Sequence, residues 1–501
     1  MTVRSWIVAG VLLLAPLILY WPTISYEYGF RDDYAHLREV RERPGWLMRL
    51  TSANGRPVYG IALETSLLDI HQVPQLEILR ATSAVLIGCV AVLLWWQFRR
   101  YGWTEAQSAA LAAAVTVLPG TQIVVGWAIA WPIMLGLLAA VAGFLLAERG
   151  LARAGPARLA LVTAGAALYV TAGLTYQTSA LFVVMPFAAA LLLRESSTLR
   201  ADAKWTAAHL GLLFGSLAAG FLAMNIVFTE GVVQEAARMN IEPHPFIKLL
   251  WFARNPLPNS LALFALRDSY ATPAWFWLVV AGVVVVCVLG FIYGAKLRHE
   301  RYRWLFAALL LPFFAHSVSL AASSQAIGYR TLLPLSGLFL VLFAFGVRAL
   351  VVRFGVSRAA EAMTLAGLIA VGGVLAHHYS LTLIAEPQVR EWQLIQGAVN
   401  RLPLSGETRV YVVRPSTDDR STERIYADEH GSLSADAQWA LVEMFRAAVR
   451  QRFPDGLPEG MKYTLVSSMT PPIMSYDFVL DLRRLRDQGD RAPDQAIASR
   501  H

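Results

Sequence analysis

Long apolar stretches alternate with short polar segments along the first 380 residues of the chain. Many of these stretches approach 20 residues, which is the length a helix needs to cross a hydrocarbon core about 30 Å thick. The pattern predicts about eleven membrane-spanning helices. We expect them at 4–24, 78–98, 105–124, 128–147, 159–175, 177–194, 206–228, 275–295, 304–321, 332–350 and 359–377.

The composition agrees with this pattern. The chain has 501 residues, of which 56% are hydrophobic and only 16% charged, whereas soluble domains average about 25% charged residues. Arg4 precedes an apolar stretch that ends near Tyr20, but no small-x-small cleavage site follows, so we interpret it as an uncleaved first span. The fold class expected is therefore an all-α polytopic membrane protein.

Basic residues recur in every second loop, which the positive-inside rule assigns to the cytoplasm. The short turns on the opposite side, at 119–122 and 176–178, carry none. The pattern predicts a cytoplasmic N-terminus, and an odd number of spans places the C-terminus outside. Topology thus accounts for the net charge of +8 without a nucleic-acid partner. The residues of the cytoplasmic set are Arg99, Arg100, Arg149, Arg153, Arg158, Arg194, Arg200, Lys204, Lys296, Arg298, Arg301, Arg303, Arg348, Arg353 and Arg358.

Three outer segments break this rule by carrying basic residues. They are a first outer loop at 25–77, a second at 229–274, and the short loop that ends in Tyr329 and Arg330. Arginine presents a planar fork that matches phosphate, so one interpretation is an anion site. The other is ordinary solvated surface, since long translocated loops tolerate charge. The sequence leaves both open.

Charged residues become frequent after residue 379, where the predicted transmembrane domain (1–379) ends. The periodicity there predicts a small extracytoplasmic α/β domain at 380–487 and a disordered tail at 488–501. Its expected helices lie at 386–401 and 436–452, and its expected strands at 409–413, 463–466 and 476–482.

Two adjacent carboxylates, Asp32 and Asp33, follow the first span beside Arg31. Like charges side by side repel, so one of them must pair, bind a cation or share a proton. One can serve as a general base while the other orients a partner or holds a divalent cation. The alternative is that Asp33 caps an interfacial helix. His36, one turn later, is either a substrate ligand or a solvated surface histidine.

Further polar residues in outer or membrane-boundary positions are candidate substrate ligands. The turn around Asn54-Gly55-Arg56-Pro57 would return Arg56 to the membrane surface near the acids. Polar groups at membrane depth usually face a cavity or each other, so helix-to-helix hydrogen bonding is the alternative. For basic residues of the second loop, the alternative is an interfacial helix. The remaining candidates are Arg31, Tyr176, Gln177, Lys248, Arg254, Gln325, Tyr329 and Arg330.

With its first span, its Arg-Asp-Asp outer loop and its Asn-Gly-Arg-Pro turn, the chain resembles the GT-C superfamily of membrane glycosyltransferases, and within it the bacterial branch of O-antigen glucosyltransferases and lipopolysaccharide-modifying enzymes. The resemblance implies a hexosyltransferase of the bacterial inner membrane with a polyprenyl-phosphate sugar as donor. The acceptor would be a cell-envelope glycan or glycolipid. It gives Asp32 and Asp33 the role of catalytic base or metal ligand, and Arg56 and Arg330 that of donor-phosphate ligands.

Three other classes compete with this interpretation, and one of them is a purely structural membrane protein with a sensory outer domain. An O-antigen polymerase or ligase also has many spans, but such enzymes depend on arginine-rich outer loops more than on an early acid pair. A transporter would carry ionisable groups and broken helices in mid-membrane. In this chain the notable charges lie at the predicted outer boundary, which favours the transferase.

Overall fold

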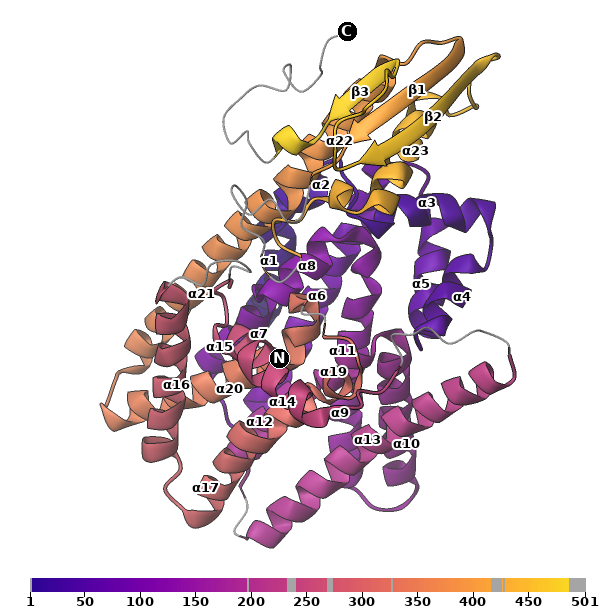
Figure 1. The fold of residues 1–501 in the computed structure, drawn as a ribbon. Coiled ribbons are helices and arrows are strands. Elements are labelled where there is room, and N and C mark those ends of the chain that lie inside the picture. Colours follow the sequence, from indigo (N-terminus) through magenta and orange to yellow (C-terminus); the bar gives the residue numbers. More distant parts are fainter. Residues whose placement is uncertain are drawn as a thin grey trace.

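The computed structural model describes residues 2–195, 198–231, 240–267, 274–325, 328–415, 426 and 429–485; the tail predicted at 488–501 lies outside these ranges. The described part is mainly helical, with a small sheet at one end (Figure 1). Seven of its helices are long and apolar enough to cross a membrane. They are α6 (Glu77–Arg100), α9 (Pro132–Leu151), α10 (Gly155–Thr175), α13 (Leu199–Thr229), α16 (Ala274–Gly294), α20 (Tyr329–Arg353) and α21 (Arg358–Ser380). The predicted fold class is confirmed.

The other four predicted spans are broken helices. The first comprises α1 (Val3–Leu19) and α2 (Trp21–Ser25), and another comprises α7 (Glu105–Thr116) and α8 (Pro119–Gly126), which meet at an angle of 49°. Proline, which has no N–H for the preceding turn, lies in the first turn of both α2 and α8. The remaining two comprise α11 (Gln177–Leu181) with α12 (Val184–Leu192), and α17 (Arg298–Leu305) with α18 (Leu311–Ala315) and α19 (Ser317–Ala321).

The expected outer turn at 119–122 is wrong. These residues begin α8, which is buried along its whole length, and the chain turns back only at Ala128–Ala130. Proline is favoured in the first turn of a helix, so Pro119 starts this helix and does not mark a turn. Gly120 lets α8 approach the start of α20, because a Cβ there would lie 2.5 Å from the carbonyl oxygen of Tyr329.

The two long outer loops are largely helical. The first folds into α3 (Asp32–Glu42), α4 (Trp46–Ala53), α5 (Pro57–Leu67) and a short 3-10 turn at Val73–Leu76. The second contains α14 (Pro245–Arg254) and α15 (Pro256–Leu261) in its described part. Helix α3 packs against the C-terminal domain, where Arg38 Nε contacts Glu443 Oε2 at 2.7 Å.

The C-terminal domain has the predicted α/β composition. Helix α21 continues through a π-helical turn at Leu381–Ala385 into α22 (Glu386–Asn400), so the helix runs without interruption across the predicted domain boundary. The parallel sheet has the order β2-β1-β3, with Val410 opposite both Leu465 and Phe478. Its strands are β1 (Gly406–Val413), β2 (Met461–Ser468) and β3 (Phe478–Asp481), and α23 (Gln438–Arg452) packs on α22 and β2.

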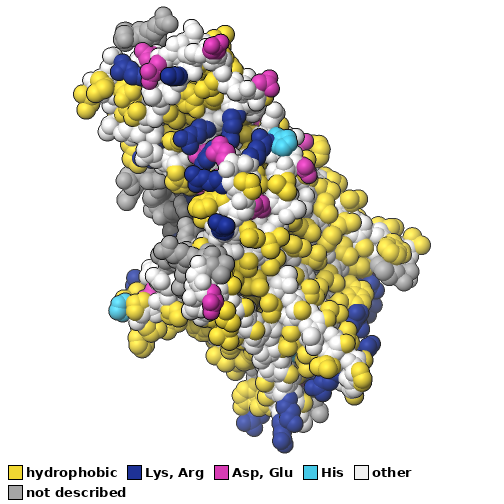
Figure 2. All heavy atoms as spheres, turned by 90° about the vertical axis from the view of Figure 1, so that its right-hand side faces the viewer, with side chains coloured by type: hydrophobic (Ala, Val, Ile, Leu, Met, Phe, Trp, Pro, Cys, Tyr) yellow, Lys and Arg dark blue, Asp and Glu magenta, His cyan; other side chains and the backbone are white. Residues whose placement is uncertain are grey.

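The surface divides into zones along the long axis of the molecule. In Figure 2 hydrophobic side chains cover the middle, and basic side chains gather at the lower end, away from the C-terminal domain. A hydrophobic middle is what lipid contact requires, so the protein is integral to the membrane. The basic lower end agrees with a cytoplasmic face, although the absolute orientation stays a prediction.

Candidate functional site

Asp33 is a buried residue whose hydrogen bonds connect the first outer loop to a distant backbone segment. Its side chain is wholly buried, Oδ2 accepts the backbone N–H of Phe30 at 2.7 Å, and Oδ1 accepts that of Ile129 at 3.0 Å. Burial raises the pKa of Asp33 to about 6, against the opposing effect of these two N–H groups. Asp33 is the second residue of α3 and not its N-cap, so the capping alternative is wrong. Each oxygen accepts a backbone N–H and the side chain has no exposed surface, so in this structure Asp33 holds the backbone of the loop.

Arg80, a residue that was not among the predicted candidates, fixes the segment leading to the acids. Its guanidinium is fully buried and donates hydrogen bonds to the backbone carbonyls of Ile24, Tyr26 and Tyr28. The guanidinium also lies over the Tyr28 ring, 4.2 Å from its centroid. A charged residue inside the span predicted at 78–98 was the sequence signal that could have identified it.

Asp32 differs from its neighbour. It is half-buried as the first residue of α3, and among the described residues its carboxylate has no hydrogen-bond or ion-pair partner. The residue before it, Arg31, has φ +46° and ψ −104°. Non-glycine residues rarely adopt positive φ, and such conformations concentrate at functional sites. The backbone N–H of Arg31 donates to Ser434 Oγ at 2.8 Å.

Three predicted ligands, Arg56, Tyr176 and Gln177, come together. Arg56 Nε donates to Gln177 Oε1 at 2.9 Å, and its guanidinium lies over the Tyr176 ring, 4.3 Å from the centroid. The Gln177 amide in turn donates to the backbone carbonyls of Asn54 and Gly55. The turn that carries Arg56 is therefore tied to the break between α10 and α11.

Arg330 joins this group from the first turn of α20. Its guanidinium lies over the Trp127 ring, 4.6 Å from the centroid. Trp127 also meets Phe30 edge to face at 5.0 Å. The indole thus lies next to both Arg330 and the segment that leads into Asp32. The Arg330 side chain keeps 27% of its surface exposed, so part of it remains accessible.

Glu429, from the C-terminal domain, is a second residue that the sequence did not indicate. Its side chain is 3% exposed, and Oε1 lies 2.8 Å from Arg330 Nη1. Burial raises the pKa of Glu429, while the Arg330 charge opposes the rise. Gly328 makes room for it, because a Cβ there would lie 2.7 Å from Oε1.

Tyr59 lies among the charged members of the cluster. Its hydroxyl donates to the carbonyl oxygen of Ile129 at 2.6 Å, and Ile129 is the residue whose N–H binds Asp33. Burial raises the pKa of Tyr59. The bond to Ile129 links the helix that starts after Arg56 to the segment between α8 and α9, which contacts both Arg330 and Asp33.

The other predicted ligands make contacts of their own. His36 Nδ1 lies 3.0 Å from Glu39 Oε2 within α3. Tyr329 is buried, and its hydroxyl accepts the backbone N–H of Arg267 at 2.9 Å. Lys248 is buried and donates to the carbonyl of Ser324, so it joins α14 to the segment before α20. Arg254 and Gln325 are exposed.

The divalent cation considered for the two aspartates does not fit Asp33, because its side chain is wholly buried and its two oxygens are directed at backbone N–H groups. Within the described ranges, no group of three or more His, Cys, Asp or Glu side chains is arranged to hold a metal ion. Asp32 alone supplies one ligand. The chemistry considered below therefore uses only the side chains of the chain.

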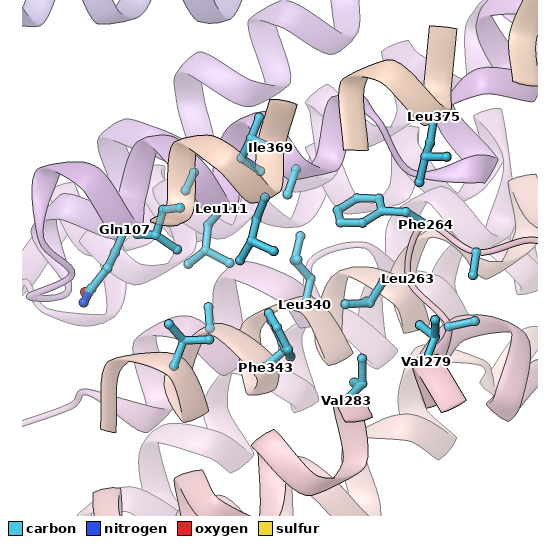
Figure 3. Close-up of a pocket in the computed structure, with 18 of the residues that line it drawn as sticks. Gln107, Leu111, Leu263, Phe264, Val279, Val283, Leu340, Phe343, Ile369 and Leu375 are labelled. Carbon is cyan, nitrogen blue, oxygen red and sulfur yellow. The ribbon is translucent and has the colours of Figure 1, made fainter. Parts of the chain in front are cut away.

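An apolar cavity of about 330 Å³ lies beside α20 in the hydrophobic zone (Figure 3). In Figure 3 Gln107 lies at one end and Leu375 at the other, with the apolar side chains of Leu340, Phe343 and Val283 between them. Tyr379, another lining residue, packs in the same small hydrophobic cluster as Tyr329, the neighbour of Arg330. The cavity thus extends along α20 toward the turn that carries Arg330.

No protein-family model and no curated protein sequence matches the chain. Among solved structures, it is similar to the archaeal oligosaccharyltransferase AglB from Archaeoglobus fulgidus in complex with an inhibitory peptide and a dolichol-phosphate, with 11% identity and a TM-score of 0.46. That alignment covers 89% of this chain and 64% of AglB, so the chain spans less than two thirds of AglB.

It is also similar to ArnT from Cupriavidus metallidurans bound to undecaprenyl phosphate, with 12% identity, a TM-score of 0.44, and coverage of 91% of this chain and 90% of ArnT. The apo form of ArnT gives 13% identity and a TM-score of 0.42. With TM-scores below 0.5, these similarities assign no function to the chain.

Proposed function

We propose that the protein is a membrane glycosyltransferase that moves a sugar from a polyprenyl-phosphate donor to a hydroxyl group of an extracytoplasmic acceptor. One observation carries the proposal. Asp32, a carboxylate without a described partner, lies two residues after Phe30, whose ring meets Trp127, and Trp127 in turn stacks on the Arg330 guanidinium. Arg56, stacked on Tyr176, directly precedes the helix whose Tyr59 hydroxyl binds Ile129 in the same segment as Trp127. A base and a phosphate-binding pair are the groups that this transfer needs.

The arginines are suited to a phosphate that gains charge as it leaves. Guanidinium groups bind phosphate through parallel N–H bonds, and donors held in place beforehand stabilise developing charge without reorganisation. Tyr176 lies under the Arg56 guanidinium, with 4.3 Å between the guanidinium and the ring centroid, and stacking of this kind limits the orientations that Arg56 can adopt. Trp127 and Glu429 fix the orientation of Arg330.

The apolar cavity supplies a place for part of the lipid tail. Its lining is almost entirely hydrophobic, and it runs along α20, whose first turn carries Arg330. The first α20 residue that lines the cavity, Leu340, lies about 15 Å along the helix from Arg330, so a donor with its phosphate at Arg330 could extend isoprene units beyond the first few into this cavity. Such burial contributes about 25 cal/mol for each Å² of apolar surface removed from water, although a tail already dissolved in lipid gains less.

The reaction follows from these positions. Asp32 takes the proton of the acceptor hydroxyl, and the oxygen attacks the anomeric carbon from the face opposite the phosphate. A new C–O bond forms as the bond between the anomeric carbon and the phosphate oxygen breaks, and that oxygen leaves with the electron pair. The anomeric configuration inverts. The lipid phosphate stays bound by Arg56 and Arg330 until it is released.

The resemblance to GT-C enzymes extends the proposal to finer features. On that basis the sugar is a hexose, the acceptor is a cell-envelope glycan or a lipopolysaccharide-type glycolipid, and the enzyme resides in a bacterial inner membrane with its C-terminal domain outside. We also propose that Asp32, rather than Asp33, is the base, because only Asp32 retains oxygens without described partners.

The direct test uses purified protein in liposomes with a panel of polyprenyl-phosphate hexoses labelled in the sugar. The expected result is release of lipid phosphate and transfer of label from at least one donor to an envelope glycolipid acceptor. If every labelled donor remains intact with extracts of envelope glycans and glycolipids as acceptors, the proposed function is wrong.

A further inference from the structure

The C-terminal domain reaches into the candidate site through the segment 429–435. Glu429 of this segment contacts Arg330, and Ser434 accepts the backbone N–H of Arg31, the residue directly before Asp32. The partners Arg31 and Ser434 are separated by 403 positions in the sequence. Figure 1 shows this domain seated over α2 and α3, at the end of the molecule where the acids lie.

Ser434 is itself held by a buried polar network. Its hydroxyl donates to Gln388 Oε1 at 2.6 Å, and its backbone N–H donates to Glu391 Oε2 at 3.0 Å. The next residue, Ala435, donates its N–H to Glu391 Oε1 at 2.7 Å. The Ser434, Gln388 and Glu391 side chains are all buried and lie on or against α22. Since α22 continues from α21, the network is anchored to a membrane-spanning helix.

The orientation of the hydroxyl bonds follows from their donors. Because the Ser434 proton is given to Gln388, its oxygen lone pairs face the Arg31 N–H. Gln388 is fixed in turn, since its amide donates to the carbonyl of Ser432 at 2.7 Å. Every member of the network therefore favours the rotamer in which Ser434 accepts from Arg31.

Arg31 needs such support because its backbone is strained. A non-glycine residue with φ +46° persists only where its surroundings impose it. On one side, Asp33 ties Phe30 to Ile129; on the other, Ser434 holds the N–H of Arg31 itself. The backbone of Arg31 sets the direction in which the first turn of α3 leaves, and with it the position of Asp32.

We propose that Ser434 is a positioning residue for glycosyl transfer: the C-terminal domain completes the active site by holding Arg31 in the conformation that presents Asp32 to the acceptor. This inference rests on the proposed function. If Ser434 has this role, the C-terminal domain contributes directly to catalysis and does more than shield the site. Its covalent link to the transmembrane domain would then keep Ser434 beside Arg31.

The test compares two near-isosteric variants, Ser434→Ala and Ser434→Cys, with Glu443→Gln. Both Ser434 variants weaken or remove the acceptor for the Arg31 N–H. Glu443→Gln weakens the Arg38 contact between α3 and α23 without touching Arg31, so it controls for loosened docking of the domain. Turnover and the donor KM are measured for each purified protein in liposomes, alongside the thermal midpoint.

Misplacing a catalytic group by about 1 Å can lower rates about 100-fold. We expect both Ser434 variants to lose 10- to 100-fold in kcat while the donor KM changes less than threefold, because Arg56 and Arg330 stay in place. Glu443→Gln should retain kcat within about threefold even if its thermal midpoint falls. A kcat within twofold of wild type in both Ser434 variants, with an inactive Asp32→Asn, overturns the inference and leaves the function standing. Failure of the wild type to use any donor overturns the function itself.

Discussion

The backbone N–H of Ile129 donates to Asp33 Oδ1 at 3.0 Å, and this bond joins the first outer loop to the turn between α8 and α9. The same turn carries Trp127, which lies against Arg330. Asp33 therefore acts through the backbone: it fixes the distance between the segment that carries Asp32 and the segment that supports the arginine.

Replacing Asp33 by Asn should destabilise the protein. An amide offers one oxygen acceptor where two backbone N–H groups converge, so one N–H would face the side-chain NH2 and remain unpaired. A buried unpaired group costs about 1–3 kcal/mol. The thermal midpoint in detergent should fall, whereas Asp69→Asn, at an exposed aspartate of the same loop, should leave it unchanged. Equal midpoints for the two variants would contradict the bracing role.

The raised pKa of Asp33 predicts a pH dependence of stability. Folded Asp33 titrates near pH 6, chiefly because it is buried, while an unfolded aspartate titrates near about 3.9. Between these values the folded protein binds the extra proton, so the free energy of unfolding falls as the pH rises from about 4 to about 6. The contribution of this group approaches about 3 kcal/mol across that window.

Asp33→Asn cannot titrate and provides the reference. The stability of the wild type relative to this variant should decline between about pH 4 and pH 6 and level off above. Denaturation curves at several pH values in the same detergent measure it. Parallel pH profiles for the two proteins would show that Asp33 does not titrate in this range.

Removing the Arg330 guanidinium should impair use of the donor. Arg330→Ala loses the fork, the stacking on Trp127 and the pairing with Glu429, which would then be buried without its cation. Loss of one preorganised group of this kind typically costs about 100- to 1000-fold in rate. Arg330→Lys keeps the charge without the planar fork, and should recover only part of kcat/KM.

Arg49→Ala is the matched control, since Arg49 is exposed in the same outer region. It should transfer sugar at the wild-type rate. Because Arg330→Ala also unpairs a buried glutamate, the double variant Arg330→Ala with Glu429→Gln separates folding from donor binding. A double variant that is stable and fully active would rule out Arg330 as a phosphate ligand.

Filling the apolar cavity should discriminate donors by tail length. Val283 lines the cavity from α16, whereas Val285 on the same helix is largely exposed on the outer surface of the fold. Val283→Trp should raise the KM for long-chain donors about tenfold and leave donors with one or two isoprene units unaffected. Val285→Trp should affect neither, and identical KM values for both donor lengths in Val283→Trp would show that the tail lies elsewhere.

The sequence pattern was sufficient for most elements of the fold. Helix and strand periodicities depend on local residue order, so the spans and the α/β domain could be predicted to within a few residues. Breaks were harder, because Pro119 suits either a turn or the first turn of a helix. The need for glycine at position 120 is visible only in the folded protein, where α20 packs against it too closely for a Cβ.

Site residues could be predicted from the sequence only where a polar residue stands at the end of an apolar segment. Asp32, Arg56 and Arg330 are polar residues at boundaries of apolar segments, and contacts through Phe30, Trp127 and Tyr59 link the segments that carry them. The sequence could not show that Asp33 is buried and hydrogen-bonded while Asp32 has no described partner. One partner of Asp33 is the backbone N–H of Ile129, which lies 96 residues away in the chain. Glu429 and Ser434 lie in a distant polar stretch with no local signal of any role.

Asp32 is proposed as the base for transfer of a lipid-linked sugar. The most direct measurement is the rate of label transfer from a polyprenyl-phosphate hexose in liposomes for the wild type, Asp32→Asn and Asp69→Asn, each with its thermal midpoint. Because a positioned base contributes about 100- to 10,000-fold, Asp32→Asn should lose that factor with an unchanged midpoint while Asp69→Asn stays active. Transfer by Asp32→Asn at the wild-type rate would contradict the account.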